Sequence, residues 1–336
     1  ADAIREAARF YATNKPACIQ WGNAIDQGVN SFQTARAISI LRAITGNLGV
    51  PGGESQWSSS GLLEWTSPEL VLWDKMPADK WERRVGADHK LVPLFHRVLP
   101  QSIVEAVLIG EPYPIRAIFV QGANPLVTYS NAQQTYRALK KLDFLVAVDL
   151  FMTPTAALAD VVLPVASYLE FDNLVAPPYY PIAQVQQKVA EIGQCRSDYE
   201  IINGLAKKLG LERYFWSDTE SFLDAILKPV GLTFSEFRKV GVTSGKKLYR
   251  RYEVNGFETP SGKVELYSSQ LEKWEFDPLP TYDEPPETPH SDPELAKEYP
   301  LVFTTWTSGL YRHSGGKQIA SLRGSHPEPI VMVHPE

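Results

Sequence analysis

Residues 144–164 constrain the fold of this chain more than any other stretch. They begin with an apolar run, residues 144–148, of the kind that forms a parallel strand buried on both faces. Thr153 and Pro154 then supply a capping hydroxyl and a proline suited to the first position of a helix. After a helix of about two turns, a second apolar run covers residues 161–163. This succession of strand, loop, short helix and strand predicts a parallel α/β sheet.

Polar side chains follow the first of these strands at its carboxyl end. Asp149 comes directly after the apolar run, and Thr153 and Thr155 lie in the loop beyond it. Ligands of open α/β sheets bind at this edge, so these residues are candidates for a binding site. Asp and Thr are also favoured as turn and cap residues, and the pattern alone leaves both interpretations open.

An earlier segment has the same organisation. An apolar strand is predicted at residues 115–120, and Gly122, Asn124 and Pro125 follow it before a helix. Glycine lets a ligand approach the backbone, and the Asn124 amide offers both a donor and an acceptor, although an Asn-Pro pair is also an ordinary turn dipeptide. A right-handed crossover between the two strands would bring Asn124 and Asp149 to the same edge of one sheet.

The composition predicts a globular chain and excludes several classes of partner. With 336 residues, of which 44% are hydrophobic, the chain can bury a large core and is long enough for about two domains. A net charge of -6 gives no basic patch for nucleic acid, and no apolar run is long enough to predict contact with a membrane. The two cysteines, Cys18 and Cys195, lack C-x-x-C spacing, which excludes a cysteine-ligated iron–sulfur cluster or zinc site formed by this chain alone. No targeting segment is recognisable, so the localisation stays open.

Periodic patterns predict further elements before the sheet. Helices are expected at residues 2–13 and 31–46, and an apolar strand at residues 17–21. Another helix is expected to begin at Ser102, with a capping box to Glu105.

The composition changes towards the C-terminal part. Residues 275–300 are rich in proline and acidic residues, which indicates an extended linker and a domain boundary near residue 285. An apolar strand is then predicted at residues 301–305. His313 follows in a polar run and could serve as a general acid or base. A hydrogen bond that orients a cofactor is the favoured role, because no paired carboxylate accompanies it.

Five stretches, in this order along the chain, resemble the signatures of one enzyme family. They are WGNAIDQG with TGNLGVPGG (21–28 and 45–53), VQGANPLVTYSNAQ (120–133), FLVAVDLFMTPTAALADVVLP (144–164), TPSGKVELYS (259–268) and TTWTSGLYRHSGGKQIASLR (304–323). The family is that of the molybdopterin oxidoreductases, of the dimethyl sulfoxide reductase and formate dehydrogenase type. The resemblance implies a Rossmann-like parallel-sheet α/β domain with flanking helices, the later part of which would be residues 1–285. Residues 286–336 would be a linker and the first element of a C-terminal β-barrel domain.

The same resemblance implies a cofactor, a bis-molybdopterin guanine dinucleotide that carries molybdenum or tungsten. The candidate cofactor-binding residues are Gly22, Gly122, Asn124, Pro125, Thr128, Asp149, Phe151, Thr153, Thr305, His313 and Ser314. Asn124 and Thr128 would contact the guanosine, and the Asp149 carboxylate could accept hydrogen bonds from N1 and the exocyclic amino group of guanine. The diphosphate would lie against backbone amides near the glycines. Pterin dithiolenes would hold the metal, so we nominate neither a metal ligand nor a catalytic residue in this chain.

The resemblance further implies that the chain is part of a larger enzyme and is inactive alone. Its partners would be an N-terminal iron–sulfur region with a 4Fe-4S cluster and the rest of the C-terminal barrel, and an electron-transfer subunit is a further candidate. The favoured reaction is two-electron redox, by oxygen-atom transfer or dehydrogenation of a small substrate. One alternative is a non-redox, tungsten-dependent hydratase of the acetylene hydratase type, which residues 151–156 and 259–301 resemble. The other is a cofactor-free binding module.

Overall fold

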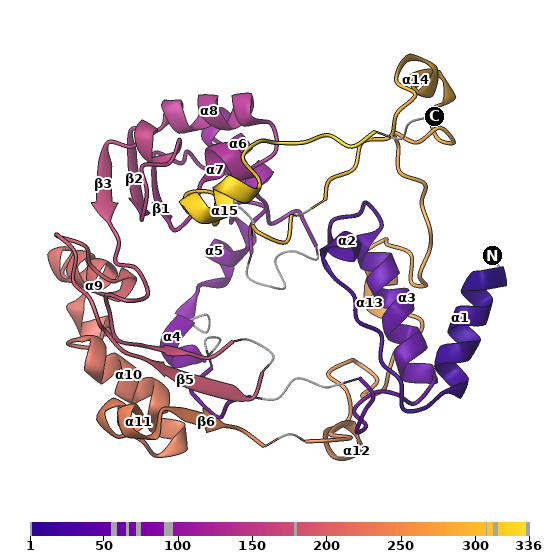
Figure 1. Ribbon diagram of the computed structural model, residues 1–336, viewed down its shortest axis with the longest axis horizontal. Helices are drawn as coiled ribbons and strands as arrows, with labels where there is room; N and C mark the ends of the chain where they lie inside the picture. Colours follow the sequence, from indigo (N-terminus) through magenta and orange to yellow (C-terminus); the bar gives the residue numbers. More distant parts are fainter. Residues whose placement is uncertain are drawn as a thin grey trace. The chain divides into compact units, whose positions relative to one another are not determined.

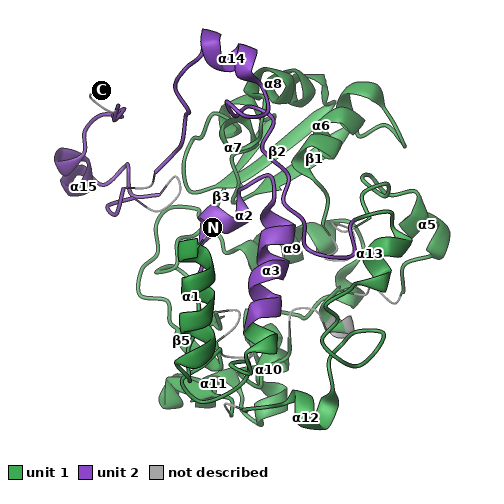
Figure 2. Ribbon diagram, turned by 90° about the vertical axis from the view of Figure 1, so that its right-hand side faces the viewer, with its two compact units in different colours: residues 1–19, 42–276 green, residues 20–41, 277–336 purple. Residues whose placement is uncertain are grey.

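The chain forms two compact units. The computed structural model describes residues 2–54, 59–64, 67–71, 75–90, 97–177, 180–246, 248–306, 308–311 and 315–333. Unit 1 contains Ala1–Ile19 and Arg42–Phe276, and unit 2 contains Gln20–Leu41 and Asp277–Glu336 (Figure 2). The domain boundary predicted near residue 285 separates a cofactor-binding domain from the start of a barrel domain. The division into these two units does not test it, so it stays a prediction.

A parallel sheet of three strands lies in unit 1 (Figure 1). Its strands are β1 (Ala117–Gln121), β2 (Phe144–Asp149) and β3 (Val161–Pro164), in the order β1-β2-β3. Ala147 pairs with Val120 on one side and with Val162 on the other. The predicted parallel α/β organisation is therefore confirmed. The helix expected between β2 and β3 is shorter than predicted, since only a 3₁₀ turn, η3 (Ala156–Leu158), is present.

Two helices pack on this sheet and supply most of its core. They are α6 (Pro100–Ile109) and α8 (Ala132–Lys141). Val104 and Val107 of α6 pack with Ala138 of α8, and Leu139 of α8 packs with Val120 and Leu145 of the strands. Burial of these apolar side chains is the main favourable term that holds the layers together.

The predicted start of α6 is wrong. The helix begins two residues before Ser102, at Pro100, and its N-cap Leu99 offers no side-chain cap, so the Ser102–Glu105 capping box is not used. Proline fits the first turn because its fixed φ is helical and its missing N–H would have no partner there. Gly110 ends the helix in the left-handed conformation, with φ at 90°.

A second sheet and several helices complete unit 1. The sheet is antiparallel, with the strands β4 (Asn173–Val175), β5 (Ile182–Gln186) and β6 (Val242–Ser244) in that order. The remaining elements are α1 (Asp2–Thr13), α4 (Pro68–Val71), α5 (Ala78–Glu82), α7 (Pro125–Thr128), α9 (Asp198–Lys208), η4 (Glu212–Tyr214), α10 (Thr219–Leu227), η5 (Lys228–Val230), α11 (Phe234–Val240), α12 (Tyr252–Asn255) and α13 (Ser269–Lys273). Phe234, Phe237 and Leu227 form the centre of the core between α10, α11 and β5.

The segment predicted as a strand at residues 17–21 is not one. Its backbone amides donate to side chains instead: Ala17 N to Asn47 Oδ1 at 3.1 Å, and Ile19 N to Glu54 Oε1 at 2.6 Å. The segment is apolar like a strand, but no described strand lies beside it to complete a ladder.

Unit 2 is built around one long helix. Its elements are α2 (Asn23–Asp26), α3 (Ser31–Ile44), which enters unit 1 at residue 42, α14 (Pro293–Glu298) and α15 (Ala320–Ser325). The predicted helix at residues 31–46 is thus confirmed, with an end two residues earlier. Side chains on and next to α3 hold the proline-rich segment by its main-chain carbonyls, since Asn30 donates to Asp283 O at 2.7 Å and Arg36 to Pro278 O at 2.8 Å.

The strand predicted at residues 301–305 is also absent. Leu301, Val302 and Phe303 are exposed by 71–84%, and within the described ranges no strand pairs with them. A single strand satisfies its backbone groups only against a neighbour, so an apolar β-prone sequence alone does not produce one. None of the helices in the described ranges combines the length and apolar character that crossing a bilayer requires.

Replacement of Leu145 by alanine is expected to lower the free energy of unfolding by about 2–5 kcal/mol, because it leaves a cavity at the centre of the parallel sheet. Leu145 is 2% exposed, whereas its neighbour Phe144 is 45% exposed. Phe144→Ala is the matched control and should cost about 1 kcal/mol or less. Urea denaturation measures both, and equal losses would contradict this assignment of the core.

Candidate cofactor-nucleotide site

The carboxyl ends of β1 and β2 lie side by side. Gln121, the last residue of β1, pairs with Val148, and the Gly122 amide continues the ladder by donating to Val148 O at 2.9 Å. Residues that leave β1 therefore emerge next to Asp149, the last residue of β2. The predicted meeting of the two loops at one edge of the sheet is confirmed.

Asn124 joins the two loops through its side chain. Its Oδ1 accepts hydrogen bonds from Thr155 Oγ1 at 2.7 Å and from Thr155 N at 3.3 Å. The Thr155 hydroxyl in turn accepts from Leu126 N at 3.1 Å, and Thr155 is fully buried. The Thr155 hydroxyl and the side-chain oxygen Oδ1 of Asn124 thus hold the two loops together. Within the described residues, nothing accepts from the Asn124 amide nitrogen, which leaves two donors for a ligand.

Asp149 keeps one oxygen available. Its Oδ1 accepts from Phe151 N at 3.2 Å in a local turn, and no donor to Oδ2 is found in the part of the chain that the structure describes. The Asp149 side chain is half-buried. The neighbouring Phe151 is 54% exposed, which leaves an aromatic ring open to solvent beside a carboxylate.

The threonines predicted at this site act mainly as caps. Thr153 Oγ1 accepts from Ala156 N at 3.1 Å, as predicted for a capping hydroxyl. The first helical position predicted for Pro154 is wrong, because η3 begins at Ala156 with Thr155 as its N-cap. Thr128 Oγ1 donates to Asn124 O at 3.1 Å within α7. Pro125 occupies the first turn of α7 and is buried.

Gly122 leaves space beside its backbone. Its φ is +57°, in the left-handed region, and an added Cβ would meet no atom within 4 Å. The backbone beside this glycine is therefore accessible to a ligand.

Sequence analysis missed a second carboxylate at the same edge. Gln121 Nε2 donates to Asp198 Oδ1 at 2.5 Å, although the two residues are 77 positions apart. Asp198 is the first residue of α9, which packs on the sheet through Ile201 against Val148. A capping box at Ser197 fixes the start of α9, and this was the only local signal.

This arrangement does not test the other candidate residues. Gly22, the N-cap of α2, and Thr305 belong to unit 2, and their part in a cofactor site stays a prediction. His313 and Ser314 lie outside the described residues. Within the described ranges, no three His, Cys, Asp or Glu side chains come together as metal ligands.

A cavity of about 250 Å³ lies between β1, α6 and α8. Apart from Gln121 and Thr135, its lining side chains are apolar or aromatic, among them Val104, Ile118 and Tyr129. A diphosphate could not be solvated there, so we do not assign this cavity to the nucleotide.

Comparison with known proteins identifies the family. The model of the molybdopterin oxidoreductases matches residues 8–208, which include the whole parallel sheet and its carboxyl edge. The chain belongs to the molybdopterin oxidoreductase family. The resemblance seen in the sequence is thereby confirmed, and membership implies a molybdopterin cofactor with molybdenum or tungsten.

Several members of the molybdopterin oxidoreductase family are similar to the chain over most of its length. Acetylene hydratase of Syntrophotalea acetylenica is 36% identical over 370 residues, which cover 100% of this chain and 50% of that protein. Dimethyl sulfoxide reductase DmsA of Escherichia coli is 28% identical, over 90% of this chain and 41% of that protein. F420-dependent formate dehydrogenase 1 subunit alpha of Methanococcus maripaludis is 26% identical, over 100% of this chain and 49% of that protein.

A solved structure also matches. Acetylene hydratase from Pelobacter acetylenicus superimposes with a TM-score of 0.87 at 34% identity, over 99% of this chain and 50% of that one. The chain thus spans about half the length of these relatives.

Asn124→Ala is expected to lower the free energy of unfolding by about 1–3 kcal/mol, because the buried Thr155 hydroxyl loses its acceptor. Asn124→Asp keeps an oxygen that can accept from Thr155 and should retain most of the stability. Thermal denaturation of the two variants makes the comparison, and equal destabilisation would contradict the role of Oδ1.

Proposed function

We propose that unit 1, which contains the parallel sheet, binds the guanine nucleotide end of a bis-molybdopterin guanine dinucleotide. The proposal rests chiefly on Asp149, which lies at the carboxyl edge of the parallel sheet and whose Oδ2 accepts from no donor among the described residues. Gln121, Asp198 and the exposed Phe151 surround the same edge.

The chemistry of guanine suits this set of side chains. Guanine presents two adjacent donors, N1–H and the exocyclic amino group, and a carboxylate is the acceptor that matches such a pair. An exposed aromatic ring can stack on the base, as Phe151 would here. The amide donors of Asn124 remain available for the ribose or for the O6 atom of the base.

The charge at this edge favours the base over the diphosphate. Two carboxylates, Asp149 and Asp198, would repel phosphate oxygens placed next to them. We therefore assign the edge at Asp149 to the base. The Gly122 amide already donates to Val148 O, so the diphosphate would lie against other backbone amides near the glycines. Gly22, Thr305, His313 and Ser314 are proposed contacts to the rest of the cofactor.

The reaction itself belongs to the complete protein. The bound cofactor would supply a molybdenum or tungsten centre for two-electron chemistry, and the residues of this chain would hold its nucleotide in place. We propose that the complete enzyme oxidises or reduces a small substrate with the help of an iron–sulfur region, the rest of the barrel and an electron-transfer subunit, and that this chain alone is inactive.

Hydration without net redox change is the second candidate. It is favoured by the 36% identity to acetylene hydratase, against 26% and 28% for the formate dehydrogenase and dimethyl sulfoxide reductase relatives. The nucleotide contacts proposed above would be the same in either case.

Metal and pterin analysis of the full-length protein tests the cofactor directly. We expect molybdenum or tungsten with about two pterins per chain, as for a bis-pterin cofactor. Tungsten would favour the hydratase, and molybdenum the oxidoreductase. A protein purified with neither metal nor pterin would leave the cofactor-free binding module as the better description.

Asp149→Ala in the full-length protein is expected to weaken nucleotide binding about 10- to 100-fold, since a charged hydrogen-bond acceptor is lost. Pterin content per chain, measured by fluorescence after oxidation, reports this loss. Asp143→Ala is the matched control, because Asp143 directly precedes β2 at its opposite end and its side chain forms an exposed ion pair with Arg116. Unchanged pterin content in Asp149→Ala, with the control also unchanged, would refute the assignment.

A further inference from the structure

The cavity of about 250 Å³ between β1, α6 and α8, which we call the α6–α8 cavity, lies within unit 1 (Figure 2). Its helical walls include Val104 and Val107 of α6 and Ala138 and Leu139 of α8. All four side chains are at most 8% exposed. The interior of the cavity is therefore apolar and shielded from water.

The cavity reaches the surface at the carboxyl end of β1. Gln121 and Ala123 belong to its lining and are exposed, whereas the four helix residues are buried. A small molecule can therefore enter from this end while α6 and α8 stay folded.

The volume of the cavity suits one aromatic ring with a few further atoms. Apolar cavities of about 150 Å³ stay free of water and take up benzene or xenon. An empty cavity leaves its walls without contacts on one side, and a ligand restores these contacts. Within the described part of the chain no charged side chain lines the cavity, so a charged ligand would be buried without a partner. An uncharged molecule is therefore the class that fits.

One buried hydroxyl adds a polar contact to these walls. Thr135 of α8 lines the cavity and is 1% exposed. Its Oγ1 donates to Ser130 O at 3.4 Å, which is long for a hydroxyl, and it accepts from no donor among the described residues. The oxygen is therefore able to accept from an O–H or N–H group of a ligand. Tyr129, which packs against the residues shared by α6 and α8, supplies an aromatic wall.

We propose that the α6–α8 cavity binds a small, uncharged aromatic molecule with one hydrogen-bond donor, of about the size of phenol. The ring contacts Val107, Ala138 and Tyr129, and its donor bonds to Thr135 Oγ1. A molecule bound there fills the space between the two helices and β1, and it stabilises unit 1 because it binds the folded state alone. The inference goes beyond nucleotide binding and does not depend on it, since Asp149 is not part of the lining.

Calorimetric titration of the full-length protein with phenol and with toluene tests the site. Toluene has the shape of phenol but no donor. Both should bind with a Kd of about 1 mM or lower. Thr135→Val keeps the shape of the side chain and removes its hydroxyl, so it should weaken phenol binding about 3- to 10-fold and change toluene binding by less than about twofold.

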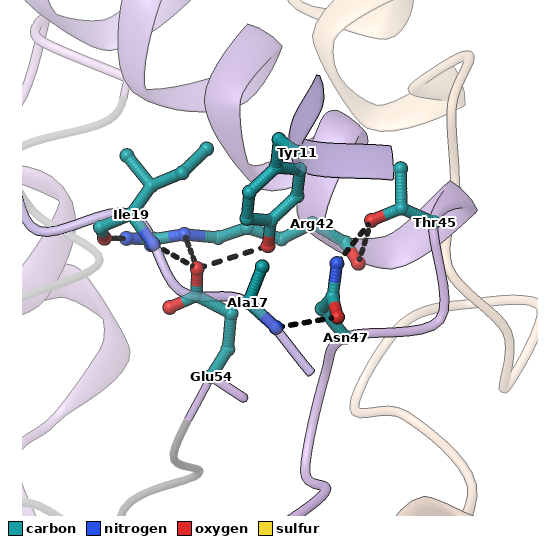
Figure 3. A network of polar contacts seen from close by, with 7 residues as sticks. All are labelled: Tyr11, Ala17, Ile19, Arg42, Thr45, Asn47 and Glu54. Carbon is teal, nitrogen blue, oxygen red and sulfur yellow. Dashed lines mark hydrogen bonds and ion pairs between the residues drawn. The ribbon is translucent and has the colours of Figure 1, made fainter. Parts of the chain in front are cut away.

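Two further variants separate the cavity from other sites and from general loss of stability. Ala138→Leu places a larger side chain in the cavity and should abolish the binding of both molecules. Tyr11→Phe is the control, because Tyr11 does not line the cavity and its hydroxyl donates to Glu54 Oε1 at 3.0 Å in a buried polar network (Figure 3). This variant loses a buried hydrogen bond and should bind both molecules like the wild type.

Crystals of the full-length protein under xenon pressure locate the site. Xenon between α6 and α8 in the wild type, and its absence from Ala138→Leu, would support the proposal. A wild type that binds neither probe, or Ala138→Leu that still binds both, would overturn it. If Ala138→Leu does not fold, Thr135→Val decides: weaker binding of phenol alone supports the site, and an equal effect on phenol and toluene refutes it.

Discussion

Strand β2 pairs in parallel with a strand on each side, and the loops and helices around this sheet of unit 1 depend on that pairing. Since β1, β2 and β3 run in the same direction, their carboxyl ends meet at one edge, and the loops that leave them must pack against each other. Helices α6 and α8 cover the sheet and keep its strands in place through Val104, Ala138 and Leu139. The polar residues proposed for the nucleotide lie close together because of this pairing.

These polar residues differ in their roles. Thr155 Oγ1 donates to Asn124 Oδ1 across the two loops, and the Thr153 hydroxyl caps a turn. The role of these three side chains is therefore mainly structural. Asp149 and Asp198, by contrast, present carboxylates at the accessible edge of the sheet. The proposal for guanine therefore depends on the carboxylates, and the loop hydrogen bonds keep them in position.

The chain spans about half of its relatives, and this separates two questions. The proposed nucleotide contacts are argued from unit 1 itself. Which reaction the protein catalyses is not decided by these contacts, since its relatives include a hydratase, a formate dehydrogenase and a dimethyl sulfoxide reductase.

The resemblance of the motifs in this sequence predicted the family. The three parallel strands and the caps at Thr153 and Ser197 could be predicted because apolar runs and capping residues act over a few neighbouring positions. The sequence misplaced strands at residues 17–21 and 301–305, where the pattern is apolar but no strand in the described part of the chain pairs with them. Only the tertiary structure brought Asp198 to Gln121, and Ile19 and Arg42 to the same oxygen of Glu54. Local pattern decides which conformation a segment prefers, whereas the partner of a distant donor is decided by how the elements pack.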